Sequence, residues 1–219
     1  MKEFKKFKGE FKRHAHQIIE DMKKEGYYPQ SIKDLMQNRM ECTQEGYPQI
    51  IYSASDTKDA IAYNSKGDAK IILDSEKITS MNYQTKFKHP NTSLPITNNE
   101  WEELSGKNVL FIQKDQISSL ENSAYYSKEE ILDSREWNFL ARDSKTLSNY
   151  FDYILPLIEK SGFYKFKLET SGIFLFGGFG YGRSNSLDVL NLGAPMHRSS
   201  ISEKDLFNGT NTFIGVKES

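Results

Sequence analysis

A stripe of large apolar side chains between residues 144 and 161 is the feature that most constrains the fold of this chain. The apolar residues recur every three or four positions, as on one face of an α-helix, and they are Leu147, Tyr150, Phe151, Ile154, Leu155 and Ile158. Ser144 can cap the first turn, and Gly162 follows the last. Pro156 has no N–H to donate, which predicts a kink nearby. We therefore expect an amphipathic helix over 144–161 that covers a sheet.

The first 25 residues combine a similar apolar spacing with many lysines. The apolar positions are Phe4, Phe7, Phe11, Ile18, Ile19 and Met22, and Gly26 follows them. This spacing predicts an N-terminal amphipathic helix over residues 2–25. Its basic residues are candidates for contact with a partner, and they are Lys5, Lys8, Lys12 and Arg13. The alternative is that these cations only solvate the outer face while the phenylalanines pack onto their own domain.

Short runs rich in isoleucine and aromatic residues indicate β-strands. Residues 60–63 and 69–73 flank a turn-forming segment, Asn64 to Asp68, and predict a hairpin. Further strands are predicted at 49–52, 78–83, 108–112, 173–176 and 212–216. A capping box at Thr97–Glu100 opens a short helix, and residues 202–207 are predicted to form a helical turn. Because the strands are short and mostly joined by turns, we expect an α+β fold with mostly antiparallel sheet(s).

The length of 219 residues is enough for one domain with a substantial core, and we expect a single domain over 1–219. A polar loop over residues 84–97 offers an alternative division. In that alternative, a helix-plus-hairpin region at 1–83 precedes a helix-plus-sheet region at 98–219.

Charge and cysteine content exclude several classes of protein. The formal net charge of −1 gives no global attraction to nucleic acid or acidic membrane. Cys42 is the only cysteine, which excludes an intramolecular disulfide and a zinc site of several thiolates. No apolar segment has the length of a membrane span or a signal peptide, so we expect a cytoplasmic protein, with signal-independent export equally consistent. The lysine and asparagine usage suggests a bacterial or mobile-element context.

Residues 177–183 are unusually rich in glycine and lead into an arginine. The candidate ligand-binding residues here are Gly178, Gly180, Tyr181, Gly182 and Arg183. Their N–H groups can form a nest for an anion beside the arginine. The alternative is a bulge or bend in a strand. The spacing is not that of a dinucleotide or P-loop site, and we expect no cofactor and no metal.

A second cluster, of Asp188, His197 and Arg198, is the only candidate for catalysis. An aspartate can orient a histidine as an acid or base, while an arginine holds a phosphate. Together with Asn191, the spacing resembles that of the lipid-II-cleaving colicin M toxins over about a dozen residues. Those toxins carry a tyrosine and a second aspartate where this chain has Leu190 and Asn191. The resemblance implies a toxin-like phosphoester hydrolase; the alternative is a turn followed by a solvated loop.

Three functions are compatible with these patterns. The absence of a nucleotide loop, metal-ligand spacing or established catalytic signature favours a non-catalytic binding, inhibitor or accessory protein that recognises a protein partner. The alternative is a small hydrolase that uses the cluster at residues 183–198. A weaker alternative is nucleic-acid binding through the basic N-terminal segment.

Overall fold

The computed structural model describes most of the chain, namely residues 2–8, 14–41, 54–85, 93–117, 128–160, 173–174, 185–193, 201–204 and 211–218. Its helices are α1 (Ala15–Lys24), α2 (Ile32–Glu41), α3 (Glu76–Thr79), α4 (Asn98–Glu103), α6 (Lys128–Asp133), α7 (Arg135–Ala141) and α8 (Ser144–Lys160). Its strands are β1 (Lys2–Lys8), β2 (Tyr28–Pro29), β3 (Ser55–Tyr63), β4 (Ala69–Ile72), β5 (Leu94–Pro95), β6 (Val109–Ile112), β7 (Ile173–Phe174), β8 (Ser186–Leu192), β9 (Ile201–Lys204) and β10 (Thr212–Glu218).

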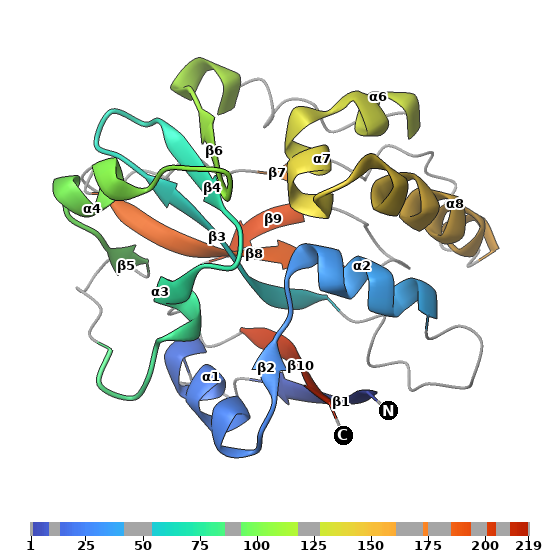
Figure 1. Cartoon of the computed structure of the whole chain (residues 1–219), viewed down its shortest axis with the longest axis horizontal. Coiled ribbons are helices and arrows are strands. Elements are labelled where there is room, and N and C mark those ends of the chain that lie inside the picture. The colour runs from blue at the N-terminus through green and yellow to red at the C-terminus, as the bar shows by residue number, and fades with distance from the viewer. Residues whose placement is uncertain are drawn as a thin grey trace.

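All of these strands belong to one sheet, in which β1, β10, β3, β8, β9 and β7 follow one another (Figure 1). β2 pairs with β10, β5 with β8, and β4 lies between β3 and β6. Only the β3–β10 and β7–β9 pairs are parallel. The predicted α+β class with a mostly antiparallel sheet is thus confirmed. Both regions of the predicted division contribute strands, since β3 pairs with β8 and β4 with β6.

Helices cover both faces of this sheet. Successive side chains of a strand point to opposite faces, so neighbouring residues of one strand pack against different helices. On β3, Ile61 and Tyr63 belong to a core cluster that includes Leu35 of α2, Trp137 of α7 and Phe151 of α8. Ala60 and Ala62 belong to a second cluster, with Ile19 of α1, Ile78 of α3 and Trp101 of α4. Figure 1 shows α2, α7 and α8 grouped apart from α1, α3 and α4.

The helix predicted over residues 144–161 is present as α8, Ser144–Lys160, with Pro156 inside it. Its side chains Leu147, Tyr150, Phe151 and Ile154 are fully buried. The helix lies mainly against α2 and α7, and α2 in turn contacts β3 and β8. The buried Arg39 of α2 joins these layers by donating hydrogen bonds to Tyr150 Oη (2.8 Å) and to the Leu192 carbonyl (3.4 Å). Helix α8 therefore covers the sheet in large part through α2, which lies between α8 and the strands.

The helix predicted over residues 2–25 is wrong in its first part. Residues 2–8 form β1, which pairs antiparallel with β10 and places Phe4 opposite Val216 and Phe7 opposite Phe213. A spacing of three fits a helix face, but in a strand it sends the two rings to opposite faces. Phe4 packs against the cluster of α2, α7 and α8, and Phe7 belongs to the other cluster. Each ring thus packs in its own core cluster, and within the described part of residues 2–25 the helix is α1, Ala15–Lys24.

Several local predictions are confirmed and two others are wrong. The hairpin is present as β3 and β4, the capping box joins Thr97 and Glu100 in both directions, and residues 109–112 and 212–218 are strands. Residues 78–83 are not a strand, because Ile78 and Met81, three residues apart, are both buried at helix α3 and the turn after it. Residues 201–204 are not helical but form β9, whose backbone pairs with β8. The strand predicted at 49–52 lies outside the described residues.

Within the described ranges, no helix is both long enough and apolar enough to cross a membrane.

Candidate functional site

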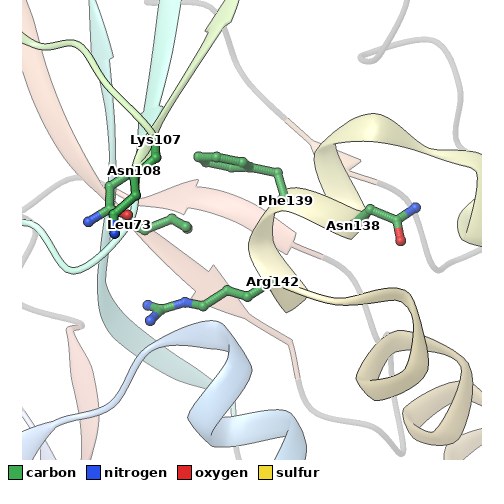
Figure 2. A pocket seen from close by; sticks show the side chains of 6 residues that line it. All are labelled: Leu73, Lys107, Asn108, Asn138, Phe139 and Arg142. Atoms are coloured by element: carbon green, nitrogen blue, oxygen red, sulfur yellow. The ribbon is translucent and has the colours of Figure 1, made fainter.

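An open pocket of about 310 Å³ lies between the β4–β6 side of the sheet and helix α7. It is lined by Leu73, Lys107, Asn108, Asn138, Phe139 and Arg142, and we call this set the pocket surface. Figure 2 shows Phe139 and Arg142 reaching from the helix side towards Leu73 and Asn108. An aromatic ring, an aliphatic wall, the Asn108 carboxamide and two cations therefore line one volume, while the Asn138 carboxamide points away from the others.

The strand side of the pocket is set by the turn between α4 and β6. Gly106 has φ +94°, a left-handed conformation that favours glycine, and Val109 N–H donates to its carbonyl at 3.1 Å. Leu73 N–H donates to the Asn108 carbonyl at 2.9 Å, which continues the β4–β6 ladder by one residue. Lys70 of β4 donates to the carbonyls of Trp101 and Leu104, both at 2.8 Å, and so fixes the end of α4. This turn places Lys107 and Asn108 at the pocket.

The helix side of the pocket is set by the two ends of α7. Ser134 caps the first turn by accepting a hydrogen bond from Trp137 N–H at 3.2 Å. Asn138 Nδ2 donates to the carbonyls of Leu132 (2.6 Å) and Ser134 (2.9 Å), which orients its carboxamide. The helix ends at Arg142, whose left-handed φ of +66° is unusual for a residue with a side chain. The Asn138 carboxamide and the Arg142 backbone are thus both fixed within α7.

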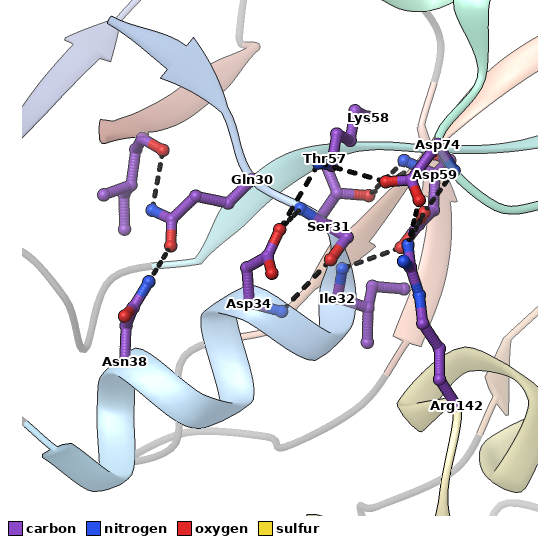
Figure 3. Close-up of polar contacts among 11 residues, drawn as sticks. Gln30, Ser31, Ile32, Asp34, Asn38, Thr57, Lys58, Asp59, Asp74 and Arg142 are labelled. Carbon is purple, nitrogen blue, oxygen red and sulfur yellow. Dashed lines mark hydrogen bonds and ion pairs between the residues drawn. The ribbon is translucent and has the colours of Figure 1, made fainter. Parts of the chain in front are cut away.

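A polar network beneath the pocket fixes Arg142, as Figure 3 shows. Arg142 Nη2 lies 2.7 Å from Asp74 Oδ2 and 3.6 Å from Asp59 Oδ1. Asp59 is fully buried and accepts hydrogen bonds from the N–H groups of Ile32 (2.7 Å) and Asp74 (2.9 Å). Lys58 lies 3.0 Å from Asp74 and 3.5 Å from Asp34. The network therefore ties the start of α2, strand β3, the end of β4 and the end of α7 together.

Backbone strain is concentrated in the same network. Asp74 and Arg142 are the two non-glycine residues with positive φ within the described part of the chain, at +50° and +66°, and they form an ion pair with each other. Such conformations cost about 1–3 kcal/mol each and persist where the surroundings determine them, often at functional sites. Backbone strain, buried charge and a pocket occur together here, and we therefore take this place as the candidate functional site.

Burial and charge act in opposite directions on the carboxylates of the network. Burial raises the pKa of Asp59 from 3.8 to about 6, against the lowering effect of its two N–H donors and of Arg142. Burial would also raise the pKa of Asp74, but the hydrogen bonds and charges of Arg142 and Lys58 outweigh it and hold that pKa below its usual value. Asp59 is therefore the member of the pair that changes its charge closest to neutral pH.

The structure places only some of the residues predicted from the sequence. Asp188 is buried in β8 opposite Ile61, and its Oδ2 accepts a hydrogen bond from Ser93 Oγ at 2.8 Å, so it is not in a turn. His197 and Arg198 lie outside the described residues, as do Gly178, Gly180, Tyr181, Gly182 and Arg183. The proposed pairing of Asp188 with a histidine stays a prediction.

The predicted basic contact surface is partly neutralised by neighbouring acids. Lys5 forms an ion pair with Glu25, and Lys2 lies 3.4 Å from Glu41. Lys8 is exposed at the end of β1, while Lys12 and Arg13 lie outside the described residues. Lysines on an edge strand such as β1 also discourage pairing with a second chain, which gives them a structural role.

Sequence reasoning missed every residue of the pocket surface. They come from three separate stretches, at residues 73, 107–108 and 138–142, and no local spacing connects them. A group of three or more histidine, cysteine, aspartate or glutamate side chains placed to hold a metal ion is absent from the ranges that the structure covers.

Comparison with known proteins identifies the fold. The overall structure is similar to a solved structure described as "Accommodation of massive sequence variation in Nanoarchaeota by the C-type lectin fold", with a TM-score of 0.69 over 99% of this chain and 98% of that chain. The two sequences are 15% identical, so the likeness concerns the fold alone. This chain therefore has a C-type lectin fold. No protein-family model and no curated protein sequence matches it.

Proposed function

We propose that this protein is a non-catalytic binding protein that recognises a protein partner through the pocket surface. The composition of that surface carries the proposal, because Phe139, Arg142 and Lys107 line one pocket together with the amide of Asn108. Aromatic residues and arginine are enriched at the centres of protein interfaces, where they anchor the partner. A volume of about 310 Å³ suits one or two side chains of a partner.

The end of β6 is linked to the start of α7, which helps to hold the two sides of the pocket together. Arg135 Nη2 donates a hydrogen bond to the Phe111 carbonyl of β6. The Phe111 ring itself is 43% exposed and lies on the other face of the sheet from the pocket, because its strand neighbours Leu110 and Ile112 pack in the cluster of α7 and α8.

The rigidity of the frame supports the same proposal. The ion pairs of Arg142, the capped α7 and the hydrogen-bonded turn at Asn108 fix the backbone on both sides of the pocket. A surface that is already ordered loses less conformational entropy when a partner binds. The similar solved structure is described as an accommodation of massive sequence variation by the C-type lectin fold, and a fold that tolerates sequence variation suits recognition.

Panning of a random-peptide phage library on the immobilised chain tests this function. We expect enriched peptides whose binding is weakened at least tenfold by Phe139→Ala, as for truncation of an interface anchor. Tyr28→Ala is the matched control, because Tyr28 is 63% exposed on β2, which lies beside β10 and away from α7 in Figure 1. Lys107→Gln is a second test variant, whose exposed side chain is not needed for folding. Enrichment that is indifferent to both pocket variants would contradict the proposal.

A further inference from the structure

Resting on the proposed function, we propose that the pocket surface receives the carboxylate of an acidic side chain of the partner, with an apolar neighbour of that residue against Phe139. The inference depends on which donors of the pocket are already engaged and which are free.

Arg142 uses only part of its guanidinium within the protein. The ion pairs with Asp74 and Asp59 are made through Nη2, and no hydrogen bond from Nε or Nη1 to another described residue is found. The side chain is 28% exposed and lines the pocket. A guanidinium held in place by buried carboxylates, with donors left over, is oriented to bind a further carboxylate.

Lys107 supplies a second cation on the opposite side of the same pocket. It is exposed, and in the part of the chain that the structure covers its ammonium group contacts no acidic residue. This distinguishes it from Lys58 and Lys77, which form ion pairs with Asp74 and Glu100. Two cationic donors therefore converge on one volume from separate segments, which favours an anionic ligand group.

The remaining lining groups fit a peptide rather than a free ion. Leu73 and the partly buried Phe139 form an apolar wall beside the two cations and the Asn108 carboxamide. The Asn138 carboxamide points away from this wall, since its Nδ2 donates to the carbonyls of Leu132 and Ser134. A carboxylate and an apolar side chain are present together in an acidic residue with an apolar neighbour.

The charges around Arg142 limit how strongly an anion is attracted. Asp59 and Asp74 already lie within 3.6 Å and 2.7 Å of its Nη2. A second negative charge on the ligand doubles its repulsion by these carboxylates and its attraction to Arg142 and Lys107 alike. The apolar wall of Leu73 and Phe139 beside the cations therefore carries the assignment to an acidic residue with an apolar neighbour.

Titration of the ¹⁵N-labelled chain with capped dipeptides tests the inference by NMR. The probes are Ac-Leu-Glu-NH2, its neutral twin Ac-Leu-Gln-NH2, Ac-Leu-Gln-OH with a free C-terminal carboxylate, and inorganic phosphate. We expect saturable shifts of the Arg142 Nε–H and of the Asn108 side-chain amide with the glutamate probe. Lys107→Gln should weaken this binding about fivefold, as expected for removal of one exposed charge pair.

Matched controls separate the outcomes. Lys66→Gln should leave binding unchanged, because Lys66 is exposed in the turn at the other end of β4, and Lys107→Arg should restore it. Equal shifts with the glutamine twin, or tighter binding of phosphate or of the free C-terminal carboxylate, would overturn the assignment to an acidic side chain. If panning still selects peptides that depend on Phe139 while the glutamate probe does not bind, the inference fails and the proposed function stands. If neither binds, both fail.

Discussion

Replacement of the buried Asp59 by asparagine tests the physical description of the network beneath the pocket. The carboxylate accepts N–H groups from Ile32 on Oδ2 and from Asp74 on Oδ1, and both donors belong to backbone that the pocket depends on. Asp59→Asn preserves the size of the side chain but places an NH2 group against one of these N–H donors. A buried donor left without an acceptor costs about 1–3 kcal/mol.

The same substitution also removes the cost of burying a charge. A pKa raised from 3.8 to about 6 corresponds to about 3 kcal/mol at neutral pH, at 1.36 kcal/mol per pKa unit. This penalty is present above pH 6 and is relieved as the pH falls towards 3.8, because the folded protein then binds a proton that the unfolded chain does not. At pH 8 the two effects nearly cancel, so we expect Asp59→Asn to change the free energy of unfolding by only about 1 kcal/mol.

At pH 5 the buried Asp59 of the wild-type protein is largely protonated, so part of the cost of burying its charge is relieved. The asparagine of the variant carries no charge, so its stability does not gain in this way. Linkage over this range makes Asp59→Asn about 1.4 kcal/mol more destabilising at pH 5 than at pH 8. Urea denaturation of both proteins at several pH values measures this difference. His16, whose pKa is lowered chiefly by burial, titrates in both proteins and cancels. A loss of stability that is constant from pH 8 to pH 5, or that shrinks, would refute the reasoning.

Three further predictions concern the core, a close backbone approach and the pocket. Phe151→Ala should lower the free energy of unfolding by about 3–5 kcal/mol in urea denaturation, because the ring is fully buried and packs edge-on against Trp137 and Tyr150. A loss of less than about 1 kcal/mol would contradict the place of this ring in the core. Gly215→Ala should cost about 1–3 kcal/mol in the same assay, since its Cβ would lie 2.9 Å from both Phe7 Cε2 and Tyr27 Cβ, whereas an unchanged midpoint would refute that approach. Binding of Ac-Leu-Glu-NH2 should tighten about threefold when the pH is lowered from 7.5 to 5.5, because protonation of Asp59 removes a negative charge near Arg142. The charges of Asp74, Asp34, Lys58 and the glutamate do not change over this range. Equal or weaker binding at pH 5.5 in an NMR titration would contradict this prediction.

The parts of the fold that were predictable from the sequence depend on neighbours along the chain. The apolar stripe of α8 and the capping box at Thr97 have local spacings that only a helix satisfies. The turn of the β3–β4 hairpin is likewise made by adjacent residues, with Asn64 Oδ1 accepting from Lys66 and Asp68 N–H. Such elements can be read before any tertiary contact is known.

The parts that were missed depend on contacts between distant segments. Phe4 and Phe7 fit a helix face by spacing, and only pairing with β10, more than 200 residues later, makes that stretch a strand. The start of β3 reads as polar, yet Asp56 and Asp59 are buried because Asn191, Asn211 and two backbone segments supply their hydrogen bonds. These partners cannot be recognised from composition or period.

The pocket was unpredictable for the same reason. Lys107 belongs to a turn and Phe139 to a helix, and each is unremarkable within its own segment. The site arises only where the end of α7 meets the end of β4 through the ion pair of Arg142 with Asp74. Its chemistry is thus a product of tertiary structure.

Hydrogen–deuterium exchange of the whole chain, with and without a peptide selected by panning, tests the central claim most directly. The account predicts that the peptide slows backbone exchange at residues 106–112 and 135–142, on the two sides of the pocket surface, and that Lys107→Gln reduces this protection at a fixed peptide concentration. Protection confined to β1 and α1, with exchange around the pocket unchanged, would contradict it.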